Sequence, residues 1–173
     1  TNTLVGALAG DALTVGNSNV VMGYNALGND TKGDRTVAIG LNALLSQNFT
    51  TSTDSYNVAV GYQAGFSTST GVQNTLVGGL AGDAITDADL NVALGYNALT
   101  ANTVGSQSVA VGAFSLGSQN PDSAGNMLNT AVGHSAGFAV TTGTKNTLIG
   151  GLAGNANTIG NENVALGFNA LGS

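Results

Sequence analysis

The apolar residues of this chain follow one short pattern that recurs along its whole length. A polar residue is followed by Val or Thr, a second apolar residue, a large aliphatic and then Gly, as in Asn74-Thr75-Leu76-Val77-Gly78. We number these positions zero to four. The pattern begins ten times, at Asn2, Asn19, Thr36, Asn57, Asn74, Asn91, Ser108, Asn129, Asn146 and Asn163. Because positions one and three alternate with position two, each repeat is predicted to contain a short strand of about four or five residues.

The repeats have a regular spacing. Most have the length that separates Asn2 from Asn19, seventeen residues, whereas those beginning at Thr36 and Ser108 are four residues longer. Four repeats therefore form a superperiod of 72 residues, which divides the chain into 1–72, 73–144 and a partial third, 145–173. A fixed period of this kind is typical of proteins in which each unit packs on the next. We expect a single array of ten rungs, without a linker or domain boundary.

Two arrangements suit short strands at this spacing: antiparallel hairpins, or the coils of a parallel solenoid. Two-residue hairpins favour Asn-Gly or Asp-Gly turns, and the sequence contains neither dipeptide. Equivalent positions also carry equivalent residues, as the stacking of similar rungs requires. The sequence therefore predicts an all-β fold, a parallel β-solenoid of ten rungs, each seventeen or twenty-one residues long.

Two positions of the repeat predict corners of the coil. Gly occupies position four in every repeat, which indicates positive φ or a close backbone approach. These corner glycines are Gly6, Gly23, Gly40, Gly61, Gly78, Gly95, Gly112, Gly133, Gly150 and Gly167. Asn at position zero is expected to bond through its amide to its neighbours or to the local backbone of a turn. These turn asparagines are Asn2, Asn19, Asn57, Asn74, Asn91, Asn129, Asn146 and Asn163.

The two faces of each predicted strand differ in side-chain size. Position three is always a large aliphatic, whereas position two is Ala in six repeats. The large residues are expected to bury one face of the strand. The core of one chain is then too small to cover the position-two column. We expect neighbouring chains to cover it, because a continuous apolar patch is rarely left exposed.

Position five, after each corner glycine, alternates between large and small residues, with Leu41 the only intermediate. It is occupied by Ala7, Tyr24, Leu41, Tyr62, Gly79, Tyr96, Ala113, His134, Gly151 and Phe168. We expect each ring to lean over a small neighbour about 4.8 Å away; a stripe that stacks on carbohydrate is the alternative. His134 is expected to pack in a core or an interface, largely buried if this column faces another chain. Three such histidines around a trimer axis, holding an ion or water, are the alternative.

The repeats resemble the head repeats of trimeric autotransporter adhesins, whose signature is Ser-Val-Ala-Ile-Gly. Thr36-Val37-Ala38-Ile39-Gly40 and Ser108-Val109-Ala110-Val111-Gly112 match it best. The array is also similar to repetitive segments of phage tail fibres and other bacterial surface fibres. The resemblance implies a left-handed parallel β-roll in which three chains pack side by side, and a role in surface attachment. Both the short and the long repeats of this chain exceed the compact adhesin repeat in length.

Composition limits the classes of partner. Only 7% of the residues are charged, with 3 Lys+Arg against 9 Asp+Glu and a net charge of −6. Nucleic acid and anionic membranes are poor partners for such a chain. No apolar run has the length of a membrane span, so we expect no membrane insertion by this segment. The absence of Cys excludes disulfides and thiolate metal sites.

The search for catalytic chemistry predicts no enzyme, cofactor or metal site. No residues repeat in a way that gives the single histidine the partners of a catalytic triad. The glycine-rich stretch 78–82 lacks the Lys and Ser/Thr of a phosphate-binding loop. Asp83, Asp87 and Asp89 are not repeated as a group in other turns, which favours a solvated acidic corner over a cation site. Val replaces Thr in most rungs, so no threonine ladder of the ice-binding kind is expected.

The two long repeats offer candidate attachment loops, since loops on a rigid scaffold can vary their contacts. Their insertions lie within Leu45–Tyr56 and Gly117–Leu128. Both contain Ser-Gln-Asn, as Ser46, Gln47 and Asn48 and as Ser118, Gln119 and Asn120. Bulges without a binding role are the alternative.

The function expected from the sequence is structural. We expect a fibre or stalk segment of a virion tail fibre or cell-surface appendage, located outside the cell and partnered by itself as a homotrimer. The first alternative is an adhesive head that binds a host receptor, matrix or glycan. The second is a filament subunit that stacks end to end through open strand edges.

Overall fold

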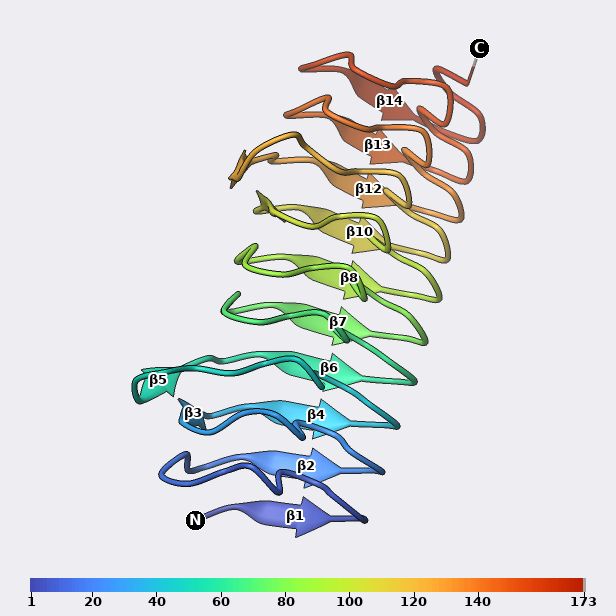
Figure 1. Ribbon diagram of the computed structural model, residues 1–173. Helices are drawn as coiled ribbons and strands as arrows, with labels where there is room; N and C mark the ends of the chain where they lie inside the picture. Colours follow the sequence, from blue (N-terminus) through green and yellow to red (C-terminus); the bar gives the residue numbers. More distant parts are fainter. Residues whose placement is uncertain (173) are drawn as a thin grey trace.

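A computed structural model of the chain, which describes residues 1–172, is a parallel β-solenoid of ten stacked rungs (Figure 1). One strand from each rung, at positions one to three, joins a ten-stranded sheet that runs from one end of the stack to the other. The strands of this sheet, in spatial order, are β1 (Thr3–Val5), β2 (Val20–Met22), β4 (Val37–Ile39), β6 (Val58–Val60), β7 (Thr75–Val77), β8 (Val92–Leu94), β10 (Val109–Val111), β12 (Thr130–Val132), β13 (Thr147–Ile149) and β14 (Val164–Leu166). The predicted parallel solenoid is confirmed, with strands of three residues.

The rungs stack in strict register. Position one of each strand pairs with position one of the next across short and long rungs alike, as Val58 pairs with Thr75 and Val37 with Val58. The extra length of each long rung extends sideways, where a short strand of that rung pairs in parallel with the end of the preceding rung to form a small two-stranded sheet. These small sheets are β3 (Gly33–Asp34) with β5 (Thr53–Asp54), and β9 (Gly105–Ser106) with β11 (Gly125–Asn126). The insertions therefore leave the main sheet undisturbed.

The core lies inside the coil, between the strands and the turns of the same chain. Position two faces inward: Ala59, Leu76 and Ala93 have no exposed surface. The expectation that other chains cover this column is wrong. The turn segment of each rung folds over it instead, and Leu at position eight, such as Leu27 and Leu99, is also completely buried. Small side chains at position two suit this narrow interior, and the Val or Thr at position one and the large aliphatic at position three face outward.

Leucine and glycine alternate in a complementary way inside the core. Where position two is Leu, position eight is Gly in the same rung. It is also Gly in the rung immediately before, where there is one. A Cβ on Gly82 would lie 2.8 Å from one methyl of Leu76, and a Cβ on Gly65 would lie 2.8 Å from the other. Leu148 fills the same space against Gly137 and Gly154. One strand leucine therefore occupies the volume that two turn leucines fill elsewhere, which keeps the interior close-packed.

The turns are built from left-handed backbone held by neighbouring rungs. Position six has positive φ in every rung without containing Gly, as at Asn97 (φ +53°), and position eight follows at Leu99 (φ +57°). Left-handed backbone costs an L residue roughly 1–2 kcal/mol. The cost is offset by hydrogen bonds between rungs, such as that from Asn97 N to Gly79 O at 3.1 Å. Stacking therefore fixes the turn conformation.

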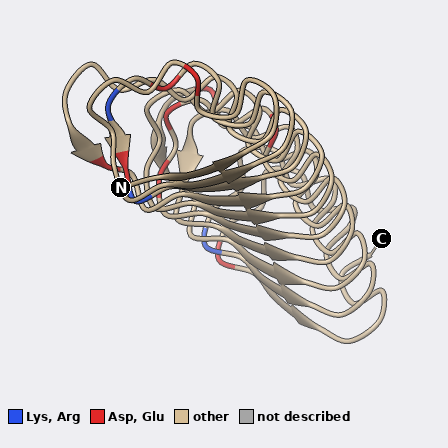
Figure 2. Cartoon of the chain, turned by 90° about the horizontal axis from the view of Figure 1, so that it is seen from below, with Lys and Arg blue, Asp and Glu red and all other residues tan. Residues whose placement is uncertain are grey.

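The charged residues are unevenly distributed around the coil. Seen along the stack, they lie at the corner where the strands begin and on the side formed by the turns (Figure 2). The corner where the strands end carries no Lys, Arg, Asp or Glu at positions four to six of any rung. Among residues 1–172, no helix is long and apolar enough to span a membrane.

Candidate functional site

The corner where the strands begin is built from a ladder of buried amides. Each turn asparagine before the last rung uses its side-chain oxygen to accept a hydrogen bond from the backbone N–H at position zero of the next rung. The bond from Asn91 N to Asn74 Oδ1 is 3.0 Å long. The side-chain Nδ2 of Asn74 donates across the coil to Ala88 O at 2.8 Å. Asn74 and Asn91 are completely buried, so this ladder satisfies backbone groups and presents nothing to a partner.

Glutamine replaces asparagine in the ladder at the two long rungs. Gln47 donates to Thr36 Oγ1 at 3.1 Å and accepts from Asn57 Nδ2 at 2.8 Å. Gln119 donates to Ser108 Oγ at 3.1 Å and accepts from Asn129 Nδ2 at 2.9 Å. Both glutamines are completely buried. They bridge the rung that lacks Asn, and a partner has no access to their side chains.

The other residues of the two Ser-Gln-Asn segments lie nearer the surface. Asn48 and Asn120 are exposed, and Ser46 and Ser118 are half-buried. Asn120 Oδ1 accepts a 2.7 Å hydrogen bond from Thr103 Oγ1 of the preceding rung. Surface for an attachment role in these segments is therefore limited to the serine and asparagine side chains. The sequence signal for the buried glutamines was their identical placement in the only two rungs that begin without Asn.

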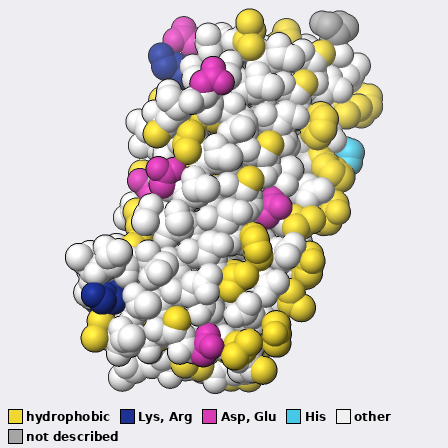
Figure 3. Space-filling view, viewed as in Figure 1, with side chains coloured by type: hydrophobic (Ala, Val, Ile, Leu, Met, Phe, Trp, Pro, Cys, Tyr) yellow, Lys and Arg dark blue, Asp and Glu magenta, His cyan; other side chains and the backbone are white. Residues whose placement is uncertain are grey.

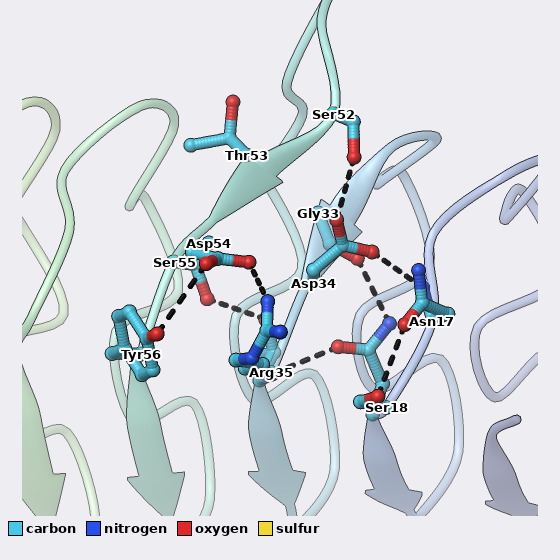
Figure 4. A network of polar contacts seen from close by, with 12 residues as sticks. Asn17, Ser18, Gly33, Asp34, Arg35, Ser52, Thr53, Asp54, Ser55 and Tyr56 are labelled. Carbon is cyan, nitrogen blue, oxygen red and sulfur yellow. Dashed lines mark hydrogen bonds and ion pairs between the residues drawn. The ribbon is translucent and has the colours of Figure 1, made fainter.

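The first long rung carries a polar network beside its small sheet (Figure 4). Asp34 is almost fully buried; it accepts from Asn17 N at 2.7 Å and from Ser52 Oγ at 2.6 Å. Arg35 forms an ion pair with Asp54. The guanidinium carbon of Arg35 also lies 5.9 Å from the ring centroid of Tyr56. These contacts attach the β5 segment to the rungs before it.

The second long rung repeats this geometry without its charges. One superperiod later, Ser106, Gln107 and Asn126 occupy the positions of Asp34, Arg35 and Asp54. Gly125 and Asn126 are exposed, and the pairing of β9 with β11 is retained. The charged network is therefore a feature of one rung and not of the repeat, which favours a local structural role.

The corner where the strands end depends on glycine. All ten corner glycines have φ between +120° and +143°. A Cβ on Gly78 would lie 2.5 Å from the carbonyl oxygen of Gly95 in the next rung. Both reasons given for the recurrence of Gly, positive φ and close backbone approach, are present at this corner.

Beyond these glycines, the position-five side chains line the edge of the stack, and we call them the ring column. Hydrophobic side chains form a stripe along the edge towards which the strand arrows point (Figure 3). Tyr24, Tyr62 and Tyr96 are 54%, 53% and 52% exposed. A Cβ on Gly79 would lie 3.5 Å from the ring of Tyr96, so this ring covers the small residue of the preceding rung.

His134 lies in the ring column and is exposed in the single chain. Burial by a neighbouring chain therefore stays a prediction. Its ring meets Phe114 edge to face, with centroids 6.1 Å apart, and Phe114 also meets Tyr96 at 5.5 Å. Phe114 occupies position six, a position that the sequence reasoning did not consider. The sequence does carry a signal for Phe114: it is an aromatic residue, next to the small Ala113, at a position that is polar one superperiod earlier.

The acidic residues do not converge. Asp83 accepts from Thr100 Oγ1 at 2.6 Å, whereas Asp89 accepts from Val72 N at 2.8 Å. Among the residues that the structure describes, no group of three or more His, Asp or Glu side chains could hold a metal ion. The same part of the chain encloses no pocket.

The outer face of the ten-stranded sheet is a mainly apolar surface that runs along the stack. Val or Thr at position one and a large aliphatic at position three point outward from every rung. Met22 and Leu94 are both 46% exposed. Comparison of the chain with known protein families, with curated proteins and with solved structures finds no match.

Proposed function

We propose that this chain is a structural segment of an extracellular fibre, in which three copies pack side by side through their outer sheet faces. Such a segment acts as a stiff spacer on a virion or a cell surface and holds attachment elements away from it. The resemblance of its repeats to the heads of trimeric autotransporter adhesins and to tail-fibre segments supports this role. The proposal assigns no catalytic reaction to the chain.

The outer sheet face is the observation that carries the proposal. Position three is a large aliphatic on all ten rungs and position one is Val or Thr, so a mainly apolar surface runs along the stack. Large contiguous apolar patches on soluble proteins mark interaction sites. Because every rung contributes the same two positions, the surface that best complements it is a second copy with the same rung spacing.

The shape of this face favours three copies over two. Each strand is three residues long and presents only two outward columns. Around a three-fold axis, each column can contact a different neighbour, and the ring of contacts closes. A closed ring covers the apolar columns of every copy and leaves the turn side, with its charged residues, in water.

The stack itself suits a spacer. Every strand of the main sheet pairs in register with its neighbours, and the buried amide ladder crosslinks the rungs along the corner where strands begin. Stability in such arrays comes from nearest-neighbour contacts that repeat along one axis. Length can therefore increase by adding rungs without changing the cross-section.

A pair of lysine variants tests the proposed interface. Leu94→Lys places a charge on the outer sheet face, whereas Thr70→Lys places one on an exposed residue of the turn side. Sedimentation velocity should show a trimer for the unchanged chain and for Thr70→Lys, and a smaller species for Leu94→Lys. Circular dichroism checks that both variants keep the sheet. Loss of the trimer in Thr70→Lys alone, or no effect of Leu94→Lys, would contradict the proposed interface.

A further inference from the structure

The rings of the ring column have a period of two rungs. They occur on rungs two, four, six, eight and ten, as Tyr24, Tyr62, Tyr96, His134 and Phe168. Rungs of a parallel sheet are about 4.8 Å apart, so successive rings are separated by about 10 Å along the stack. The long rungs do not interrupt this period, because their extra residues extend sideways into the small sheets. The result is a straight row of evenly spaced rings.

Two of the rings pack with one side against a glycine of the preceding rung. The rings of Tyr96 and Phe168 lie over Gly79 and Gly151, where an added Cβ would be 3.5 Å and 3.6 Å from the ring carbons. Tyr62 is 53% exposed, as expected for a ring with one covered and one open face. Gly79 and Gly151 are therefore the platforms on which the next rings rest, whereas Leu41 is the residue that precedes Tyr62 in the column.

A polar side chain accompanies each ring at position six. The pairs are Tyr24 with Asn25, Tyr62 with Gln63, Tyr96 with Asn97, His134 with Ser135 and Phe168 with Asn169. In the rungs without a ring, position six is Leu8, Asn42, Leu80, Phe114 or Leu152. Within residues 1–172, the five polar side chains paired with rings make no side-chain hydrogen bond. Four of these side chains are half-buried, and the Oδ1 atoms of Asn25 and Asn169 face the turn glycine three residues later. Their remaining donors and acceptors can bind a ligand beside the ring.

We propose that the ring column binds a neutral, extended β-1,4-linked polysaccharide along the fibre axis. This inference rests on the proposed fibre role and names the ligand of its attachment surface. The C–H face of a pyranose stacks on an aromatic ring, and the adjoining amide or hydroxyl groups bond to its hydroxyls. In a β-1,4-linked chain, successive sugars are flipped, so every second sugar presents the same face.

The spacing and the charge of the column select this ligand. The disaccharide repeat of an extended β-1,4-linked chain is close to the two-rung separation of about 10 Å. An α-1,4-linked chain coils and cannot follow a straight row of rings. No Lys, Arg, Asp or Glu occurs at positions five or six, so the column offers no cation to an anionic polysaccharide. The ligand requires that the ring columns remain at the surface when the outer sheet faces are covered in the proposed trimer, which is the alternative to burial of His134 by a neighbouring chain.

Binding of cellohexaose tests the proposal, with maltohexaose as the α-linked control. Titration calorimetry on the purified chain should detect cellohexaose binding and no maltohexaose binding. Tyr62→Ala should weaken cellohexaose binding roughly tenfold, the effect of losing about 1.4 kcal/mol of stacking. Ala already occupies position five at Ala7 and Ala113, so this variant is expected to fold.

Tyr56→Ala is the matched control. Tyr56 is 49% exposed, close to the 53% of Tyr62, but it precedes β6 and lies at the opposite edge of the sheet. Its replacement should leave the affinity unchanged. No cellohexaose binding, equal binding of maltohexaose, or an equal loss in Tyr56→Ala would overturn the proposal. Sedimentation of the same samples separates it from the fibre role: a trimer that fails to bind rejects only the ring column, and a monomer that binds rejects only the trimer.

Discussion

The two edges of the main sheet differ in which side chains they bury and which they expose. At the edge where strands begin, polar amides such as Asn74 are completely buried, and every ladder bond is made inside the chain. At the edge where strands end, apolar rings such as Tyr62 are half exposed and are followed by polar side chains without partners in the chain. Groups that are fully satisfied stabilise the stack, whereas groups left exposed can bind. The first edge therefore stabilises the stack, and the second is the edge at which we propose binding.

The edges also differ in their tolerance of side chains. The residue before position zero has φ between +49° and +61° in nine rungs and is never Gly; Arg35 and Tyr56 are examples. That is the left-handed region that L residues can occupy at a modest cost. The corner glycines have φ of +120° or more, where an L side chain is strained, and they touch the next rung. Gly is therefore required only at the edge where the strands end, because only there do φ and the close approach of the next rung exclude a side chain.

The largest effect is expected from a side chain at the glycine corner. In Gly95→Val, the Cβ would lie 2.6 Å from the carbonyl carbon of Gly112, with φ at +140°. We expect a loss of more than about 4 kcal/mol in the free energy of unfolding, measured in urea at one chain concentration. Ala93→Gly in the same rung should cost only about 1 kcal/mol.

Gly125→Val supplies the control for the glycine corner. Gly125 has no atom within 4 Å of an added Cβ and lies in the exposed β11 segment. Its stability should stay within about 0.5 kcal/mol of the unchanged chain. A Gly95→Val protein as stable as Gly125→Val would show that the corner does not require glycine.

An intermediate effect is expected in the buried ladder. Gln119→Leu leaves Ser108 Oγ and Asn129 Nδ2 without the contacts that Gln119 supplies. A buried polar group that loses its partner costs about 1–3 kcal/mol. Ser118→Ala, at the neighbouring half-buried residue, should be nearly neutral. Equal urea midpoints for the two variants would show that the side chain of Gln119 does not stabilise the fold.

A smaller effect is expected at the rim of the same edge. The Arg35–Asp54 pair has side chains that are 48% and 44% exposed. Exposed ion pairs contribute about 0–1 kcal/mol and are screened by salt. Arg35→Ala should therefore cost less than about 1 kcal/mol, and the difference should shrink further in about 1 M salt. A loss comparable to that of Gln119→Leu would give this network a larger part in the fold.

The smallest effect is expected at His134. The equivalent rung of the first superperiod carries Tyr62, and His134 is exposed in the single chain. His134→Tyr should change the free energy of unfolding by no more than about 0.5 kcal/mol. A hydrolytic or metal-dependent activity that disappears in this variant would instead make the histidine a functional centre.

The repeat pattern was enough to predict the stacked rungs, because spacing and alternation depend only on local sequence. It did not tell which face of the strand points inward. Both faces are apolar, and the choice depends on the turns: Leu27, Leu44, Leu99 and Leu116 fill the coil from the opposite side and leave little room at position two. Side-chain size alone suggested the reverse.

The candidate site was predictable to a different extent at each edge. The alternation of rings with small residues was visible in the sequence. The burial of Gln47 and Gln119 was not, because both lie in long rungs that look like surface insertions. Their role depends on a contact with position zero of two successive rungs. Only the stacked structure brings these residues together.

The mass of the native particle tests the central claim most directly. One chain has a mass of 16.9 kDa, and packing through the outer sheet face predicts a particle of three times that mass. Light scattering coupled to size exclusion, across a micromolar range of concentration, measures it without a label or a ligand. A constant trimer mass is the expected result. A stable monomer over that range would contradict the account of the outer sheet face.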